Sequence, residues 1–488
     1  MKNKVLSTIT CLIAGGLLLT VSSCSESKYL DTVPPTQVRS DEIFSTPSRI
    51  LGLVNGTYKT LKDANYYGGR FQMYLDVRGE DFINTTGNSF TGYDSWANRY
   101  NSGSNDINNL WTAAYATINQ ANIIIDGIPK NPGIISDDLA AQYTGESKFL
   151  RALAYYSLVT VFAQPYVKDN GASKAVPLRL QPETTMENND LARSTVTEIY
   201  AQILKDLNEA EASLPADYTG SSAASLRVTR AHKNTAIALK TRVYLNMGNF
   251  AKVVEEAKKI VPQTTAPFSA TTGVKHVLQA NIVSTISTDY TTTESILSVP
   301  FSSLDMYSGQ SAIGYIYNNV SEYYLNPAGV LGSSQWPTTD ARRGFLRTVS
   351  SGRSYLSKFG QNAPYLIYMP LIRYSEVLLN YAEAAAETGD LTLATNLLKA
   401  VHARSDASYT FPAAATASKE ALVSSILVER RIELLGEGFR SNDLLRRLQT
   451  IPAKVGPTLS AGAVPPSSEN YIWPISNNEL VTNRLINQ

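Results

Sequence analysis

The cysteine at position 24 is the residue whose chemistry the sequence indicates most directly. Val21-Ser22-Ser23 precede it, after two lysines and an apolar run of ten residues, Cys11 to Thr20. A run of this length suits an export signal and is too short to span a bilayer as a helix. The pattern predicts that residues 1–23 are a lipoprotein signal peptide and that Cys24 is acylated after cleavage. The alternative is an ordinary signal peptide that contains a cysteine.

Neighbouring carboxylates could catalyse hydrolysis if they faced a common site. Glu80 and Asp81 lie in a loop-like stretch, and a glycosidase needs two carboxyl groups at a set separation. Adjacent residues rarely point into one site, and Arg78 is close enough in sequence to neutralise them. We therefore expect no catalytic role for this pair.

A second carboxylate pair, Glu429 and Glu433, is spaced to share one face of a helix. Arginines accompany it at positions 430, 431, 440, 446 and 447. Carboxylates beside arginines stay ionised and make poor general acids. The pattern favours an ion-pair network that joins stacked helices over an acid–base pair.

Other catalytic signatures are missing from the sequence. It has no HExxH, GxSxG, Walker A or Rossmann glycine motif, and its two cysteines lie at positions 11 and 24. We expect neither an enzyme nor a cofactor. No EF-hand spacing occurs, so the metal question stays open, with structural calcium at loop Asp and Asn residues unresolved. With 43 basic and 42 acidic residues there is no positive excess for nucleic acid.

Aromatic residues are the main candidates for ligand binding. The chain has 28 Tyr and 13 Phe, and tyrosine suits rings that are partly wet. Many rings fall in two stretches rich in Gly, Asn and Ser. The predicted contacts are Trp96 and Trp336 as stacking platforms, Tyr67, Tyr315 and Tyr317 as ring edges, and Arg70, Asp76 and Asn98 as hydrogen-bonding partners. The alternative is that most of these rings pack loops onto helices.

Helices must position these loops. Apolar residues recur every three or four positions in 106–128, 137–163, 198–214, 229–246 and 250–260, and charged helices resume from 365 to about 448. Residues 65–109 are predicted to be loops and turns, and 261–364 irregular loops with short strands.

A helical-hairpin repeat is visible twice. At offsets 2, 5, 9 and 12 from Gly248 stand Phe250, Val253, Ala257 and Ile260, and from Gly389 stand Leu391, Ala394, Leu398 and Val401. This spacing is that of the turn and second helix of a tetratricopeptide repeat. The predicted fold class is all-α dominated, with TPR-like helical hairpins and large irregular loop regions.

Motifs along nearly the whole chain resemble the SusD/RagB family. They are Lys28-Tyr29-Leu30-Asp31, the helix from Glu146 to Ala152, Leu371 to Ala384, Glu429-Arg430-Arg431 with Glu437-Gly438 and Asp443-Leu444, and Trp473-Pro474-Ile475. Ser476 departs from a usual proline. The resemblance divides the chain into an anchor and extended lead (24–62), an N-terminal part (63–260), a loop-rich part (261–364) and a C-terminal part (365–488).

The resemblance implies an outer-membrane lipoprotein that faces the cell exterior. Such a protein binds glycan and delivers it to a SusC-like TonB-dependent transporter for nutrient uptake, without chemistry of its own. Three alternatives remain: capture of a peptide or other nutrient in the same architecture, a surface glycosidase, and a structural or adhesive lipoprotein.

Overall fold

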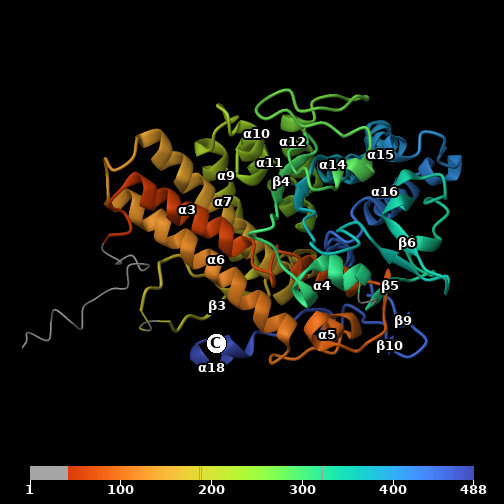
Figure 1. Cartoon of the computed structure of the whole chain (residues 1–488), viewed down its shortest axis with the longest axis horizontal. Helices are drawn as coiled ribbons and strands as arrows, with labels where there is room; N and C mark the ends of the chain where they lie inside the picture. The colour runs from red at the N-terminus through yellow and green to blue at the C-terminus, as the bar shows by residue number, and fades with distance from the viewer. Residues whose placement is uncertain (1–41, 186, 188, 320–321, 488) are drawn as a thin grey trace, which may run out of the picture.

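The computed structural model describes residues 42–185, 187, 189–319 and 322–487. The predicted signal peptide, Cys24 and the lead segment up to residue 41 lie outside these residues. Helices dominate the described chain (Figure 1). They are α3 (Pro47–Leu61), α4 (Arg70–Val77), α5 (Tyr93–Ala97), α6 (Asn105–Lys130), α7 (Asp137–Phe162), α8 (Tyr166–Asp169), α9 (Val196–Ser213), α10 (Ala223–Thr229), α11 (Lys233–Asn246), α12 (Phe250–Ile260), α13 (Ile282–Thr285), α14 (Tyr374–Glu387), α15 (Leu391–Ser405), α16 (Lys419–Glu433), α17 (Arg440–Arg446) and α18 (Asn477–Thr482).

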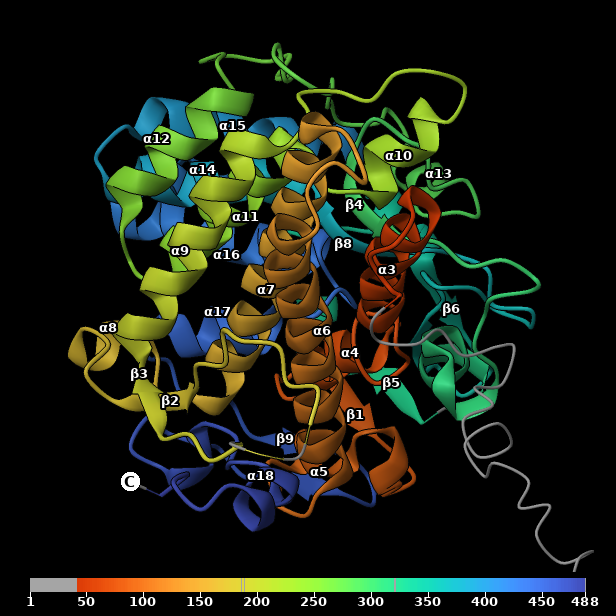
Figure 2. The ribbon, with the colours of Figure 1, turned by 90° about the vertical axis from the view of Figure 1, so that its left-hand side faces the viewer.

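The long helices stack in sequence order, as the repeat predicted. Helix α6 contacts α7, α7 contacts α9, and the series continues through α11, α12, α14, α15 and α16 (Figure 2). A single hairpin cannot cover its own apolar face, so neighbouring hairpins bury it by stacking. The predicted TPR-like, all-α architecture is confirmed.

Glycines form the two tight turns within this stack. Gly248 and Gly389 have φ angles of 69° and 96°, a left-handed conformation that costs glycine little. The helices that follow them bury Val253, Ala257 and Ile260 in one case and Ala394, Leu398 and Val401 in the other. The repeat therefore places equivalent apolar residues in the core.

Local capping sets where individual helices begin. Thr195 and Glu198 form a reciprocal capping box at the start of α9. Helix α3 begins at Pro47 after the cap Thr46, whose side chain accepts a hydrogen bond from the Arg49 N–H. Helix α11 begins at Lys233, later than predicted, because α10 is a separate short helix.

The prediction of loops for 65–109 was wrong in part, since α4 and α5 lie there. Every residue of α4 is buried, so it has no polar face and no helical period in its sequence. Its glycine-rich flanks also resemble a loop. The element that carries two predicted contacts is thus a buried helix.

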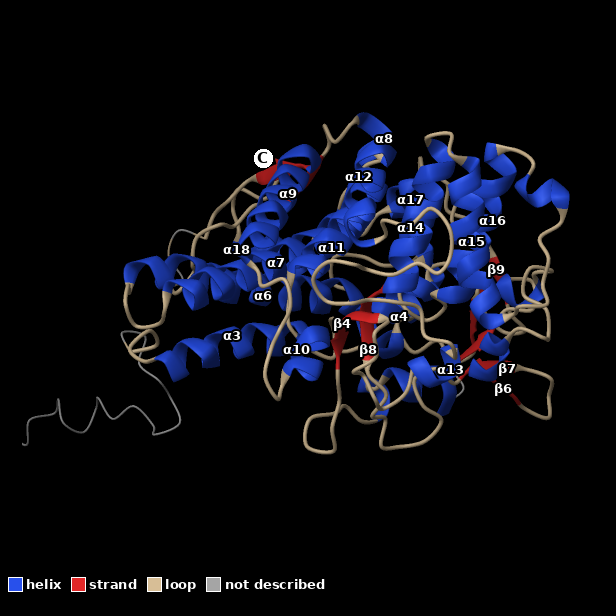
Figure 3. Cartoon of the chain, turned by 90° about the horizontal axis from the view of Figure 1, so that it is seen from above, coloured by secondary structure: helices blue, strands red, loops and turns tan. Residues whose placement is uncertain are grey.

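Short strand pairs join parts of the chain that are far apart in sequence. The strands are β1 (Phe82–Asn84), β2 (Lys174–Pro177), β3 (Arg193–Thr195), β4 (Ser295–Val299), β5 (Tyr323–Leu325), β6 (Leu346–Thr348), β7 (Ser354–Leu356), β8 (Met369–Arg373), β9 (Lys454–Val455) and β10 (Ser460–Ala461). The pairs β1–β5, β2–β3, β4–β8, β6–β7 and β9–β10 are all antiparallel. Figure 3 shows the few strands among helices and long loops. The described residues of 261–364 lie mostly in loops, with short helical turns and short strands.

A buried ion-pair network ties the last helices to the loops. Glu433 of α16 lies 2.8 Å from Arg373, 2.5 Å from Arg404 and 3.2 Å from Arg342, and Glu429 lies 2.5 Å from Arg342. Burial opposes ionisation, yet the three arginines hold the pKa of Glu433 well below its usual value. The predicted network is confirmed.

The partners within this network differ from those the sequence suggested. Arg446 and Arg447 pair with Glu383, Arg440 pairs with Glu80, and Arg430 pairs with Asp443. The arginines that hold Glu429 and Glu433 come instead from residues 342–404, which are distant in sequence.

Candidate functional site

The two aromatic loop regions predicted separately meet in space. Strand β1 pairs with β5, with Phe82 opposite Leu325, and the Tyr323 hydroxyl donates to the Thr91 carbonyl at 2.9 Å. Arg70 also bridges the two regions. We call residues 87–93 and 307–317, which lie on either side of Arg70, the loop junction.

Phe90 is the most exposed aromatic side chain of the loop junction, with 44% of its surface accessible. The Arg70 guanidinium carbon lies 4.1 Å from the centre of its ring. Arg70 is held in turn, because it donates to Asn65 Oδ1 at 2.6 Å and to the Gln310 carbonyl at 2.8 Å. A ring placed in this way is available to stack on a ligand while its position stays fixed.

Sequence reasoning missed Phe90. The available signal was a phenylalanine between Ser89 and Thr91 in a polar stretch, where nothing apolar is needed for helix periodicity. The side chain of Asn88 accepts a hydrogen bond from the Phe90 backbone N–H at 3.0 Å, which fixes the turn.

The predicted stacking platforms are core residues. Trp96 is fully buried and its Nε1 donates to the Phe82 carbonyl at 2.8 Å. Trp336 is 2% exposed, with the Arg343 guanidinium carbon 4.2 Å from the ring centre. Tyr317 is fully buried, and Tyr67 is buried beside Ser157. These four rings present no free face to solvent, whereas Tyr315 is half-buried and lies in the loop junction.

The predicted hydrogen-bonding partners also face inward. Arg70 supports Phe90, as described, and is itself 3% exposed. Asp76 accepts from the backbone N–H groups of Gly438 and Arg440, each at 3.1 Å, and burial raises its pKa to about 7. Asn98 is buried at the end of α5 with a φ of 51°. Of the predicted residues, Tyr315 and the buried Tyr317 lie in the loop junction, and Arg70 supports Phe90 from α4.

Glu80 and Asp81 are tied into ion pairs with helix residues. Arg431 Nη2 lies 2.9 Å from Glu80 and 2.5 Å from Asp81, and Arg440 Nη2 lies 2.5 Å from Glu80. Burial alone would raise the pKa of Glu80, but these two arginines lower it below its usual value. Arg78, the expected neutraliser, instead donates to the Tyr100 hydroxyl at 2.8 Å. A carboxylate held ionised in this way is unsuited to general-acid catalysis.

Among the residues that the structure describes, no three His, Cys, Asp or Glu side chains are grouped so as to hold a metal ion. No helix among them is both long and apolar enough to cross a bilayer.

Comparisons with known proteins give the family. Residues 28–245 match the family described as "Starch-binding associating with outer membrane", and residues 241–488 match the family described as "SusD family". SusD-like protein P2 of Formosa agariphila is 25% identical, over 96% of each chain.

Solved structures of SusD-like proteins have the same fold as this chain. The crystal structure of a SusD superfamily protein from Bacteroides fragilis is 30% identical and superposes with a TM-score of 0.81, covering 91% of this chain and all of the other. A laminarin-binding SusD-like protein shares the fold at 20% identity, with a TM-score of 0.68, over 90% of this chain and 98% of its own. The chain belongs to the SusD family.

Proposed function

We propose that this protein binds a neutral oligo- or polysaccharide at the cell surface through the loop junction. The observation that carries the proposal is the exposed ring of Phe90, held on Arg70 where two distant aromatic regions converge. Sugars present apolar C–H faces that stack on such rings, and their hydroxyl groups bond to amide and hydroxyl side chains. A related structure is described as laminarin-binding, which supports this ligand class.

The proposal includes delivery of the glycan to a SusC-like TonB-dependent transporter. Acylation of Cys24 would keep the protein at the outer membrane, facing the exterior, and tethering raises the local concentration of captured ligand at the transporter. The outer-membrane description of the matched family supports this location. Co-purification of a large β-barrel with the wild-type protein, but not with Cys24→Ala, from solubilised membranes tests the partnership and the anchor together.

Binding without catalysis is part of the same proposal. The arginines that hold Glu80 and Asp81 argue against the surface glycosidase alternative. Peptide capture in the same architecture is the other alternative, and a ligand panel that includes peptides separates it from glycan capture.

Calorimetric titration of the purified protein with a panel of neutral glycans tests the proposal. We expect saturable binding, no cleavage products on prolonged incubation, and binding about tenfold weaker in Phe90→Ala, as for an anchor worth more than 1 kcal/mol. Leu139→Ala is the matched control. Leu139 is an apolar side chain of similar exposure, at 38%, but it lies on the first turn of α7 and not in the loop junction. Binding of peptides alone, or turnover that Glu80→Gln abolishes, would overturn the proposal.

A further inference from the structure

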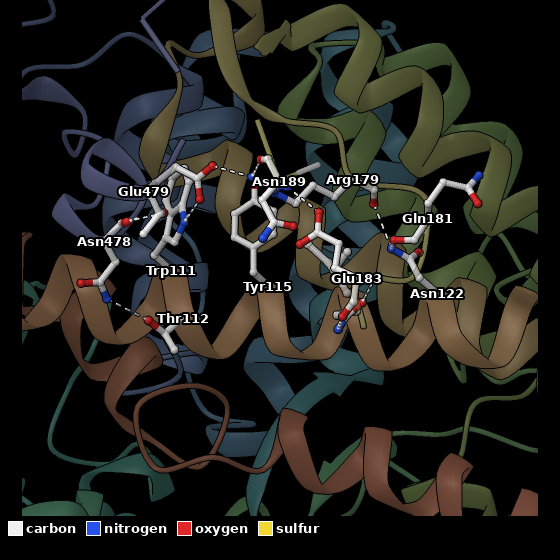
Figure 4. A pocket seen from close by; sticks show the side chains of 13 residues that line it. Trp111, Thr112, Tyr115, Asn122, Arg179, Gln181, Glu183, Asn189, Asn478 and Glu479 are labelled. Carbon is white, nitrogen blue, oxygen red and sulfur yellow. Dashed lines mark hydrogen bonds and ion pairs between the residues drawn. The ribbon is translucent and has the colours of Figure 1, made fainter. Parts of the chain in front are cut away.

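A pocket of about 350 Å³ opens on helix α6, formed by three segments that do not belong to the loop junction. One face of α6 supplies Trp111, Thr112 and Tyr115, and α18 supplies Asn478 and Glu479 (Figure 4). The facing wall is formed by Arg179, Gln181, Glu183 and Asn189. Its volume lies at the lower end of the range usual for small-ligand sites.

The wall of this pocket is rigid because side chains of α6 bind its backbone. The Tyr115 hydroxyl donates to the Pro177 carbonyl at 2.8 Å, and Asn122 Nδ2 donates to the carbonyls of Arg179 and Gln181, each at 3.1 Å. Asn119 both donates to the Glu183 carbonyl, at 2.9 Å, and accepts from the Glu183 N–H, at 2.8 Å. The pocket is therefore formed before any ligand arrives.

These bonds also disfavour an extended peptide. A peptide that adds a strand needs free backbone groups along an edge. Here the carbonyls of residues 177, 179, 181 and 183 already accept hydrogen bonds from side chains of α6 and α7.

The charges of the pocket disfavour an anion. Among its described lining residues Arg179 is the only cation, and it donates to Glu479 Oε1 at 2.8 Å, to Glu183 and to the Asn189 carbonyl at 2.9 Å. Glu479 also accepts from Trp111 Nε1 at 3.2 Å. The Arg179 guanidinium thus makes its hydrogen bonds within the wall, where it is paired with two carboxylates, those of Glu183 and Glu479.

What remains for a ligand is ring surface and neutral polar groups. The half-buried ring of Tyr115 supplies this surface, and Trp111, which is 3% exposed, packs beside it with ring centroids 5.0 Å apart. Within the described part of the chain, Asn189 Oδ1 is buried without a hydrogen-bond partner, and such an acceptor calls for a donor. Thr112, Gln181 and Asn478 are exposed at the rim.

From this arrangement we propose a second carbohydrate site, in which the pocket on α6 takes one or two neutral sugar residues. A sugar ring packs against Tyr115 while its hydroxyl groups donate to Asn189 Oδ1 and exchange hydrogen bonds with the rim amides. The proposal rests on glycan binding by the protein as a whole, but not on the loop junction. It assigns to the helical face a contact with the same glycan or with a separate short saccharide.

The test compares two tryptophan substitutions on exposed positions of α6. Thr112→Trp fills the mouth of the pocket, and Ala116→Trp is the control, because Ala116 is exposed on the same helix but does not line the pocket. Both are made in the Phe90→Ala protein and titrated calorimetrically with neutral di- to tetrasaccharides. We expect the residual binding to weaken at least tenfold with Thr112→Trp and to stay unchanged with Ala116→Trp.

A second readout does not depend on affinity changes. Wild-type protein labelled with 5-fluorotryptophan has four tryptophan signals, and each tryptophan variant has a fifth. The Trp111 signal is assigned with Trp111→Phe. A saccharide in the pocket shifts this signal in the Ala116→Trp protein and not in the Thr112→Trp protein.

The outcomes separate the two proposals. If wild-type protein binds glycans but the two tryptophan variants bind alike and the Trp111 signal does not move, the pocket proposal alone fails. A Trp111 shift caused by peptides and not by sugars also overturns it. If no glycan binds the wild-type protein, both proposals fail.

Discussion

Arg373 shows how single residues hold this structure together. Its side chain is buried at the meeting point of three carboxylates, at 2.6 Å from Glu294, 2.8 Å from Glu433 and 2.7 Å from Glu437. A buried ion pair contributes little beyond a well-packed apolar pair, but the loss of one partner leaves charges without compensation. The signature of the family in this region therefore works through packing and electrostatics.

Replacing Arg373 with Met should lower the free energy of unfolding at pH 7 by about 3–5 kcal/mol. The arginine helps to keep the pKa values of Glu433 and Glu437 low, although burial opposes it. That stabilisation is present above the usual glutamate pKa and is lost as pH falls through the lowered values. The deficit of the variant should therefore shrink below about pH 4.5.

Denaturant unfolding at several pH values measures this effect. Lys252→Met is the control, because Lys252 and Glu255 form an exposed pair whose loss should leave the free energy of unfolding nearly unchanged. A deficit for Arg373→Met that is equally small, or that does not depend on pH, would show that the network is not coupled in this way.

At the scale of elements, the hairpin turns depend on backbone conformation more than on contacts. Gly389 has a φ of 96°, and a Cβ atom added there would meet no atom within 4 Å. A substitution at this position therefore measures the free-energy cost of the left-handed backbone without any steric clash of the side chain.

Gly389→Ala should lower the free energy of unfolding by about 1–2 kcal/mol, and Gly389→Asn by less. Gly52→Ala should have the opposite effect. Gly52 is exposed in helix α3 with free space around it, so the substitution should raise the free energy of unfolding by about 0.5–1 kcal/mol. Thermal and denaturant unfolding of the three variants measures both signs. If Gly389→Ala matched the wild type, the turn would not need glycine.

The helices with a polar and an apolar face could be predicted from sequence. Helices α6, α9 and α12 appear within a few residues of their expected bounds, since burial of one face leaves a period of three to four residues. Helix α4 could not be found in this way, because all of its residues are buried. Long-range partners such as Arg342 for Glu429 were equally hidden, because nothing local specifies them.

At the scale of the whole molecule, the helical stack sets where the loops lie relative to one another. Aromatic content indicated which regions matter, and the pairing of β1 with β5 brings those regions together. Composition could not show which rings would face solvent, since Trp96 is buried by its neighbours and Phe90 is left at the surface. The candidate site was therefore predictable as a region and not as a set of residues.

Glycan binding at the loop junction is tested most directly by a crystal structure of the mature protein soaked with a neutral glycan from the calorimetric panel. We predict a sugar ring packed on Phe90 within reach of Tyr315 and the 307–317 segment. A glycan bound only elsewhere on the molecule, with Phe90 uncovered at saturating ligand, would contradict the account.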